Sequence, residues 1–131
     1  MSEQLSRKLL QVEHQGQRCL WFWCPGCEEL HQIAVDPPHP FWSWDGDAEY
    51  PVFGPSILVT GVKLTEEGER MVARGERPVN GTYPIEKTRC HSFVGCNGAH
   101  PGEIIFLDDC THPRKGSVLP LPDLPNHILE Q

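Results

Sequence analysis

Two cysteines on either side of a tight bend constrain this chain more than any other feature. In the stretch 23–27, Cys24 and Cys27 flank a Pro-Gly pair. This spacing lets both sulfurs face one metal ion, and Pro and Gly supply the bend. Far downstream, Cys90 and the run 110–112 (Cys-Thr-His) offer further ligands of the same kind. We therefore predict that one Zn²⁺ ties the early turn to a later hairpin.

The fourth ligand of this site is less constrained than the other three. His31 follows Cys27 closely enough to reach the same ion, and His112 lies two residues after Cys110. We favour Cys110, which gives a closed site of the structural kind with no position left for water. Such sites contribute on the order of 10 kcal/mol to folding. The predicted ligands are Cys24, Cys27, Cys90 and Cys110, with His31 and His112 as alternatives to the last.

The remaining cysteines are expected to be reduced. Six cysteines could form three disulfides in a secreted protein, but the opening residues 1–4 do not resemble a signal peptide. Cys19 falls within an apolar strand pattern, which predicts a small core residue. Cys96 lies in a long turn with His100, where a free thiol is the default and a second metal site the alternative. We expect a soluble, cytoplasmic protein.

Length and charge limit the function further. A chain of 131 residues suggests one domain, 1–131, and 13 Pro and 12 Gly predict many turns. The formal charge of −7, from 11 basic and 18 acidic side chains, repels a phosphate backbone. No apolar run is long enough to cross a membrane. We therefore expect neither nucleic acid nor membrane as a partner.

The apolar pattern predicts a mainly β, zinc-stabilised single domain with hairpins and one short helix. Runs of β-branched and aromatic residues predict strands, whereas Thr65 as an N-cap and Gly75 as a stop predict the helix. The aromatic residues of 41–44 are expected to pack on the rim of the core. The predicted strands are 18–23, 31–35, 56–62, 90–94 and 104–107. The predicted layout is a core at 18–119, a surface excursion at 61–88 and a Pro-rich tail at 120–131 that lies across the surface.

A set of polar residues is left over once the zinc ligands are assigned. His91 neighbours Cys90 on a strand, so the two side chains point to opposite faces. His91 and His112 near one hairpin end, with Asp109 beside them, could supply a general base and its orienting partner. Ser56 could be the nucleophile or simply a turn residue, and Cys110 is a rival nucleophile if zinc does not bind it. The candidate catalytic residues are Ser56, His91, Asp109 and His112.

Two familiar zinc-enzyme classes are poorly supported. Nucleobase deaminases carry a His-x-Glu pair beside their cysteines, and no His here is followed two residues later by Glu. The His-Glu-x-x-His helix of zinc peptidases is also absent. Any catalysis is therefore expected to use other residues.

The ordered motifs resemble a known family. They are Trp-Cys-Pro-Gly-Cys at 23–27 with His31, Trp42 and Trp44, Pro55-Ser56, Cys-His-Ser-Phe at 90–93, and Asp-Cys-Thr-His at 109–112. This series, over residues 18–119, is similar to small zinc-knuckle proteins of bacteriophages and prophages, a family sometimes mislabelled ammonia monooxygenase. The family includes a deconjugating peptidase of bacterial ubiquitin-like operons. The resemblance implies a zinc-stabilised β fold and a peptidase or isopeptidase activity. It highlights Cys24, Cys27, His31, Ser56, Cys90, His91, Asp109 and His112.

Two functions of different classes follow from these observations. The first is a hydrolase acting on peptide or ubiquitin-like conjugates. The second is a non-enzymatic zinc module that mediates protein–protein contacts. Both predict a protein or peptide partner. The sequence leaves the oligomeric state and the substrate open.

Overall fold

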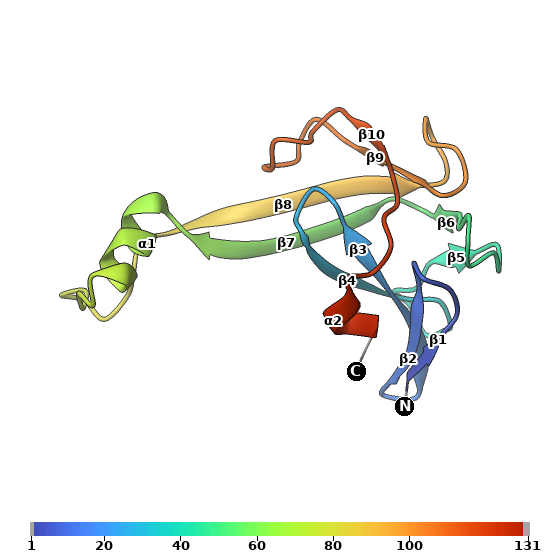
Figure 1. The fold of residues 1–131 in the computed structure, drawn as a ribbon, viewed down its shortest axis with the longest axis horizontal. Coiled ribbons are helices and arrows are strands. Elements are labelled where there is room, and N and C mark those ends of the chain that lie inside the picture. The colour runs from blue at the N-terminus through green and yellow to red at the C-terminus, as the bar shows by residue number, and fades with distance from the viewer. Residues whose placement is uncertain (1, 130–131) are drawn as a thin grey trace.

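The computed structural model describes residues 2–129 and contains three antiparallel sheets (Figure 1). The first sheet is an N-terminal meander with strand order β1-β2-β3-β4. Its first two strands are short, and its last two strands are connected by the Cys24–Cys27 bend. Its strands are β1 (Ser2–Gln4), β2 (Leu10–His14), β3 (Gln17–Cys24) and β4 (Glu29–Ala34).

The second sheet contains the other candidate site residues and has the order β10-β9-β8-β7. Its longest member, β8, pairs with β7 along eight positions and with β9 only near its C-terminal end. The strands are β7 (Ile57–Leu64), β8 (Ile85–Val94), β9 (Glu103–Phe106) and β10 (Val118–Pro120). A two-stranded sheet, β5 (Ser43–Trp44) with β6 (Phe53–Gly54), leads into β7.

Strands β7 and β8 continue past the body of the protein as a two-stranded arm (Figure 1). Helix α1 (Glu66–Ala73) lies at its far end, where the Thr65 hydroxyl accepts a hydrogen bond from Gly68 N–H as the N-cap predicted from the sequence. The expected surface excursion 61–88 is thus partly regular structure. Positions 61–64 and 85–88 are paired strand because the cross-strand ladder satisfies their polar main-chain groups.

The core lies where the sheets pack on one another. From Leu20 to Cys24, strand β3 alternates buried and half-buried side chains, and fully buried aromatic residues from three segments meet in the core. Phe22 comes from β3, Phe53 from β6 and Phe106 from β9. Trp42 and Trp44 are partly buried against this core, which confirms the predicted rim packing.

The C-terminal segment corrects one expectation. Instead of lying across the surface, it inserts Leu121, Leu124 and Ile128 into the interior, with exposed fractions of 1%, 2% and 8%. The last of these lies on the short helix α2 (Asn126–Leu129). The sequence hid this packing because the prolines at 120, 122 and 125 interrupt any regular helix or strand on which these apolar residues would form one face.

The predicted fold class is confirmed: the chain is mainly β, with hairpins and short helices. The predicted strands at 18–23, 31–35, 56–62, 90–94 and 104–107 all correspond to strands of the structure, with boundaries shifted by at most five residues. Within residues 2–129, no helix has the length and apolar character needed to span a membrane.

Candidate active site and metal centre

One strand, β8, holds residues of both candidate sites because its side chains alternate between faces. Cys90 points into the interior with an exposed fraction of 2%, and its neighbour His91 is half-buried on the other face. The bend between β3 and β4 approaches the inner face, and the loop after β9 folds back beside the outer face. The strand therefore separates a thiol cluster from a histidine–carboxylate pair by the thickness of one sheet.

The inner cluster contains four potential metal ligands. Ligand atoms of Cys24, Cys27, His31 and Cys90 all lie within 4.8 Å of one another. The sulfurs of Cys24 and Cys90 are 3.8 Å apart although 66 residues separate them in the chain. The Cys27 main-chain N–H donates to Cys24 Sγ at 3.3 Å, as expected of a tight cysteine knuckle. All six cysteines are free thiols.

His31 shows that this donor set fits a metal ion. Its Nδ1 lies 3.2 Å from the Leu30 carbonyl oxygen, so Nδ1 carries the proton and donates it. Its Nε2 is then unprotonated and free to bind a metal ion, and it is buried without a hydrogen-bond partner among the described residues. A buried polar atom without a partner is costly. A cation held by Nε2 and the three sulfurs would satisfy it.

The pKa shifts of the three thiols also favour a bound cation. Hydrogen bonds from Cys27 and Cys90 lower the pKa of Cys24 far below its ordinary value. Hydrogen bonding with Cys24 raises the pKa of Cys27 to about 12, and hydrogen bonding with Cys24 and Cys27 also raises the pKa of Cys90 strongly. One thiolate can form unaided, whereas a second or third would repel it. A divalent cation would allow all three to ionise.

The structure places the predicted ligand Cys110 slightly apart from this set. Cys110 belongs to a second group with Cys90 and His112. Its sulfur accepts the His91 main-chain N–H at 3.2 Å and donates to the His91 carbonyl at 3.2 Å. The four-membered cluster thus contains His31 in the position predicted for Cys110. The thiol of Cys110 already has protein partners, whereas His31 Nε2 has none within the described part of the chain.

On the outer face, Ser56, His91 and Asp109 form a hydrogen-bonded chain. Ser56 Oγ lies 2.9 Å from His91 Nε2, and His91 Nδ1 lies 3.2 Å from Asp109 Oδ2. A carboxylate can only accept, so Nδ1 carries the proton and Nε2 accepts from the Ser56 hydroxyl. Three residues that are 35 and 18 positions apart along the chain are thereby brought to one point.

Asp109 is held ionised by its neighbours. Desolvation opposes its charge, but hydrogen bonds from His91 and Arg89 outweigh it, and the pKa of Asp109 lies below its ordinary value. The Arg89 guanidinium approaches Asp109 Oδ2 at 3.4 Å. An ionised carboxylate at this position can orient the imidazole and stabilise its protonated form.

Ser56 is fixed from the opposite side by Trp42. The indole Nε1–H of Trp42 donates to the Ser56 carbonyl oxygen at 3.0 Å. Ser56 is the residue directly before β7, which pairs with β8 so that Leu58 lies opposite His91. The strand pairing and the indole together determine where the hydroxyl lies relative to the imidazole.

His112, the fourth candidate catalytic residue, does not take part in the hydrogen bonds that connect Ser56, His91 and Asp109. Its Nδ1 accepts the Arg114 main-chain N–H, and its Nε2 is buried without a partner among residues 2–129. The ring packs against the cysteine bend so closely that a methyl group on Gly26 would overlap it. Burial lowers the pKa of His112. His112 therefore belongs to the surroundings of the thiol cluster.

Cys110 is poorly suited to act as a nucleophile. Burial raises the pKa of its thiol, and among residues 2–129 the sulfur is hydrogen-bonded to the main chain of His91 rather than to an imidazole nitrogen. The thiolate, which is the reactive form, is therefore disfavoured. Ser56, by contrast, is paired with an imidazole nitrogen.

Two residues of this site were missed from the sequence. Arg89 lies two positions before His91, on the same face of β8, and this spacing was the available signal. Trp42 was expected only to pack on the core, and nothing in its sequence surroundings indicates a hydrogen bond to residue 56. The loop thiol Cys96 donates to the Phe53 carbonyl, and His100 pairs with Glu103. Neither joins a metal cluster among the described residues.

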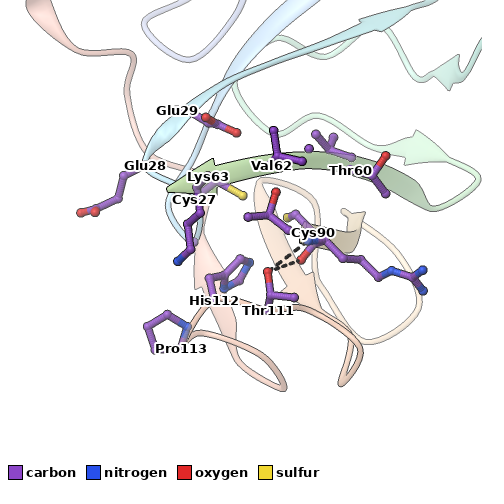
Figure 2. Close-up of a pocket in the computed structure, with 15 residues that line it drawn as sticks. Cys27, Glu28, Glu29, Thr60, Val62, Lys63, Cys90, Thr111, His112 and Pro113 are labelled. Atoms are coloured by element: carbon purple, nitrogen blue, oxygen red, sulfur yellow. Dashed lines mark hydrogen bonds between the residues drawn. The ribbon is translucent and has the colours of Figure 1, made fainter. Parts of the chain in front are cut away.

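The cysteine bend and the β7–β8 arm enclose a hollow between them. Figure 2 shows Cys27, Glu28 and Glu29 of the bend on one side and Thr60, Val62 and Lys63 of β7 on the other. The His112 ring and Thr111 close the hollow from the loop after β9. This hollow thus lies beside the thiol cluster, since Cys27 and Cys90 line it.

A serine hydroxyl hydrogen-bonded to an imidazole that contacts a carboxylate is the arrangement typical of serine hydrolases. Here it is carried on a small antiparallel β domain. The chain belongs to the BubE family, described as the serine protease of a bacterial ubiquitination-like system, whose family model matches residues 1–101. The matched part includes Ser56 and His91, and Asp109 lies beyond it. None of the curated proteins and none of the solved structures matches the chain.

Family membership bears out the part of the resemblance that concerned a peptidase of ubiquitin-like operons. The phage or prophage association and the zinc-knuckle character stay predictions.

Proposed function

We propose that this protein is a serine peptidase or isopeptidase that cleaves peptide or ubiquitin-like conjugates. Ser56 is the nucleophile, His91 the general base and Asp109 the residue that orients the imidazole. The observation that carries the proposal is the hydrogen-bonded chain with heavy-atom distances of 2.9 and 3.2 Å. The family description, a serine protease of a ubiquitination-like system, supports it independently.

The chemistry follows from this arrangement. Ser56 Oγ attacks the carbonyl carbon of the scissile amide while His91 Nε2 takes its proton. The protonated imidazole then gives that proton to the departing amine, which leaves the acyl group as an ester on Ser56. Water hydrolyses the ester, with His91 taking a proton from the water and returning it to Ser56. Asp109 stabilises the imidazolium in both halves.

We further propose that Cys24, Cys27, His31 and Cys90 hold one Zn²⁺. The ion, when bound, supplies a structural cross-link with a closed coordination shell. It would fix β8 against the bend between β3 and β4, and hence fix the strand that carries His91. His112 then acts as a packing residue beside the cluster.

Active-site labelling tests the catalytic proposal. The folded, metal-loaded protein is incubated with a fluorophosphonate probe, which forms an Oγ–P bond with an activated serine and releases fluoride. We expect modification at Ser56, located by peptide mass spectrometry, and loss of modification in Ser56→Ala and His91→Ala. The control is Ser117→Ala, which changes a serine outside the hydrogen-bonded chain and is expected to label normally.

The same experiment separates the two classes of function. An absence of modification at Ser56 in a folded sample would favour the non-enzymatic zinc module that mediates protein contacts. A parallel reaction with iodoacetamide reports on Cys110, which we expect to react slowly because its thiol is buried. Rapid, selective alkylation of Cys110 together with loss of hydrolysis would assign the nucleophile to that residue instead.

A further inference from the structure

Strand β7 has one free edge, and that edge begins beside Ser56. In the sheet order β10-β9-β8-β7, β7 is the outermost strand, and no strand of residues 2–129 pairs with its other side. Ser56 directly precedes it. Sheet edges with unpaired main-chain groups are templates for an added strand, and peptide recognition often uses them.

The ladder shows which main-chain groups face this edge. His91 lies opposite Leu58 in the pairing of β8 with β7. The His91 N–H donates to Cys110 Sγ and its carbonyl accepts the Leu107 N–H, so both groups of His91 face away from β7. In an antiparallel pair, opposite residues point their main-chain groups the same way, either toward each other or apart. The N–H and carbonyl of Leu58 therefore face outward.

The same alternation holds two residues further along the arm. Arg89 lies opposite Thr60. The Arg89 N–H donates to Thr111 Oγ1 and its carbonyl accepts the Thr111 N–H, so its groups also face away from β7. Thr60 thus presents its N–H and carbonyl outward, like Leu58. Two pairs of outward-facing main-chain groups therefore lie along the free edge, starting at Leu58, two residues after Ser56, and continuing at Thr60 toward the tip of the arm.

The exposed side chains of β7 and a hollow beside them are consistent with a ligand bound along this edge. Leu58 and Val62 share the face of β7 that Ser56 occupies, and their exposed fractions are 51% and 63%. A hollow of about 590 Å³ adjoins Val62 and is bounded by Thr60, Arg89 and Asp109. This volume lies in the range of ligand sites. Asp109 lines the hollow and is also a member of the Ser56–His91–Asp109 triad.

We infer that an extended, unfolded stretch of the substrate adds as a strand to the free edge of β7. Residues on one side of the scissile bond pair with Leu58 and Thr60, which places the amide to be cleaved at Ser56 Oγ. Recognition is then mainly through the substrate main chain, so folded segments are excluded and flexible tails are accepted. This inference rests on the proposed role of Ser56.

Two active-site probes test this inference without knowledge of the natural substrate. One is the acetylated diphenyl phosphonate of a single alanine, and the other is that of tetra-alanine. In each, Ser56 Oγ bonds to phosphorus and phenol leaves with the serine proton. We expect the longer probe to label Ser56 about tenfold faster, because two or three main-chain hydrogen bonds each contribute a few-fold. The ratio of the two rates is the readout, since it cancels effects on the triad itself.

A proline substitution removes one main-chain donor from the edge. Thr60→Pro loses an N–H that faces outward and leaves the ladder to β8 intact, and we expect the ratio to fall to about two. The matched control is Val118→Pro on β10, the opposite edge of the same sheet. The Ser117 carbonyl accepts from Phe106, so the next N–H, that of Val118, faces outward, and a natural proline already stands at position 120. We expect Val118→Pro to keep the tenfold ratio.

A second measurement uses the unaltered protein and so does not depend on a variant folding. Tetra-alanine probes N-methylated at one amide at a time should lose rate at alternate positions, the signature of strand pairing. Equal rates for the short and long probes, or a uniform loss with every methylation, would overturn the inference and leave Ser56 as the labelled nucleophile. Absence of labelling with both probes would instead remove the proposed function, and the inference with it.

Discussion

Loss of the metal is expected to destabilise the arm and the triad together. The resulting loss of folding free energy can be estimated from the structure. The Cys24 and Cys90 sulfurs join positions 66 residues apart. A cross-link that closes a loop of that length removes about 4 kcal/mol of conformational entropy from the unfolded chain. For a domain of this size, such a loss corresponds to a fall in Tm of about 15 °C. Any metal–ligand enthalpy adds to this figure.

Cys27→Ser is the suitable perturbation. Cys27 is only half-buried, so the substitution leaves little cavity and mainly removes a ligand. We expect the purified variant to contain less zinc and to melt about 15 °C below the parent protein. Ser56 labelling should also be lost at temperatures between the two midpoints. Calorimetry, metal analysis and fluorophosphonate labelling give the three readouts.

Cys96→Ser is the matched control. It changes a half-buried thiol outside the cluster, whose contact with the Phe53 carbonyl a serine hydroxyl can also make. Its metal content and Tm should equal those of the parent. The reasoning would be refuted by a purified parent protein that carries no metal and melts at the same temperature as Cys27→Ser.

Three further perturbations probe the triad. Asp109→Asn should lower the Ser56 labelling rate on the order of 10³-fold without a change in fold, because the imidazole loses its orienting carboxylate; circular dichroism and labelling kinetics check this. Trp42→Phe should lower the rate about five- to tenfold by removing the indole donor to the Ser56 carbonyl, and an unchanged rate would show that strand pairing alone positions the serine. Arg89→Ala should raise the pKa of Asp109 back toward its ordinary value, measured by carboxyl-carbon NMR titration. Because the pKa of Asp109 is lowered in the folded protein, its ionised carboxylate stabilises the fold at pH values above the ordinary carboxyl pKa. This stabilisation is lost as the pH falls through the lowered pKa of the folded protein. In Arg89→Ala the loss should occur at higher pH.

Local patterns in the sequence predicted most of the strands but not their lengths. Thr65 as an N-cap and the apolar run before Cys24 each specify an element through contacts within a few residues, and both predictions were confirmed. The arm was misjudged because residues 86–89 are polar and, apart from the half-buried Thr88, exposed. They are a strand only because β7 lies beside them and satisfies their main-chain groups. Pairing of this kind depends on a distant segment, which a local window does not contain.

The candidate site divides in the same way. The sequence by itself determined the chemical inventory: a cysteine knuckle, a Cys-His pair on one strand, and an Asp-Cys-Thr-His run. Alternation along β8 was enough to predict that Cys90 and His91 serve different faces. What only the tertiary structure decided was which residues meet: His31 with the thiols, Ser56 with His91, and His112 away from the triad. The physical reason is that a strand fixes the direction of its own side chains, whereas the partners they meet depend on sheet register and on where loops return.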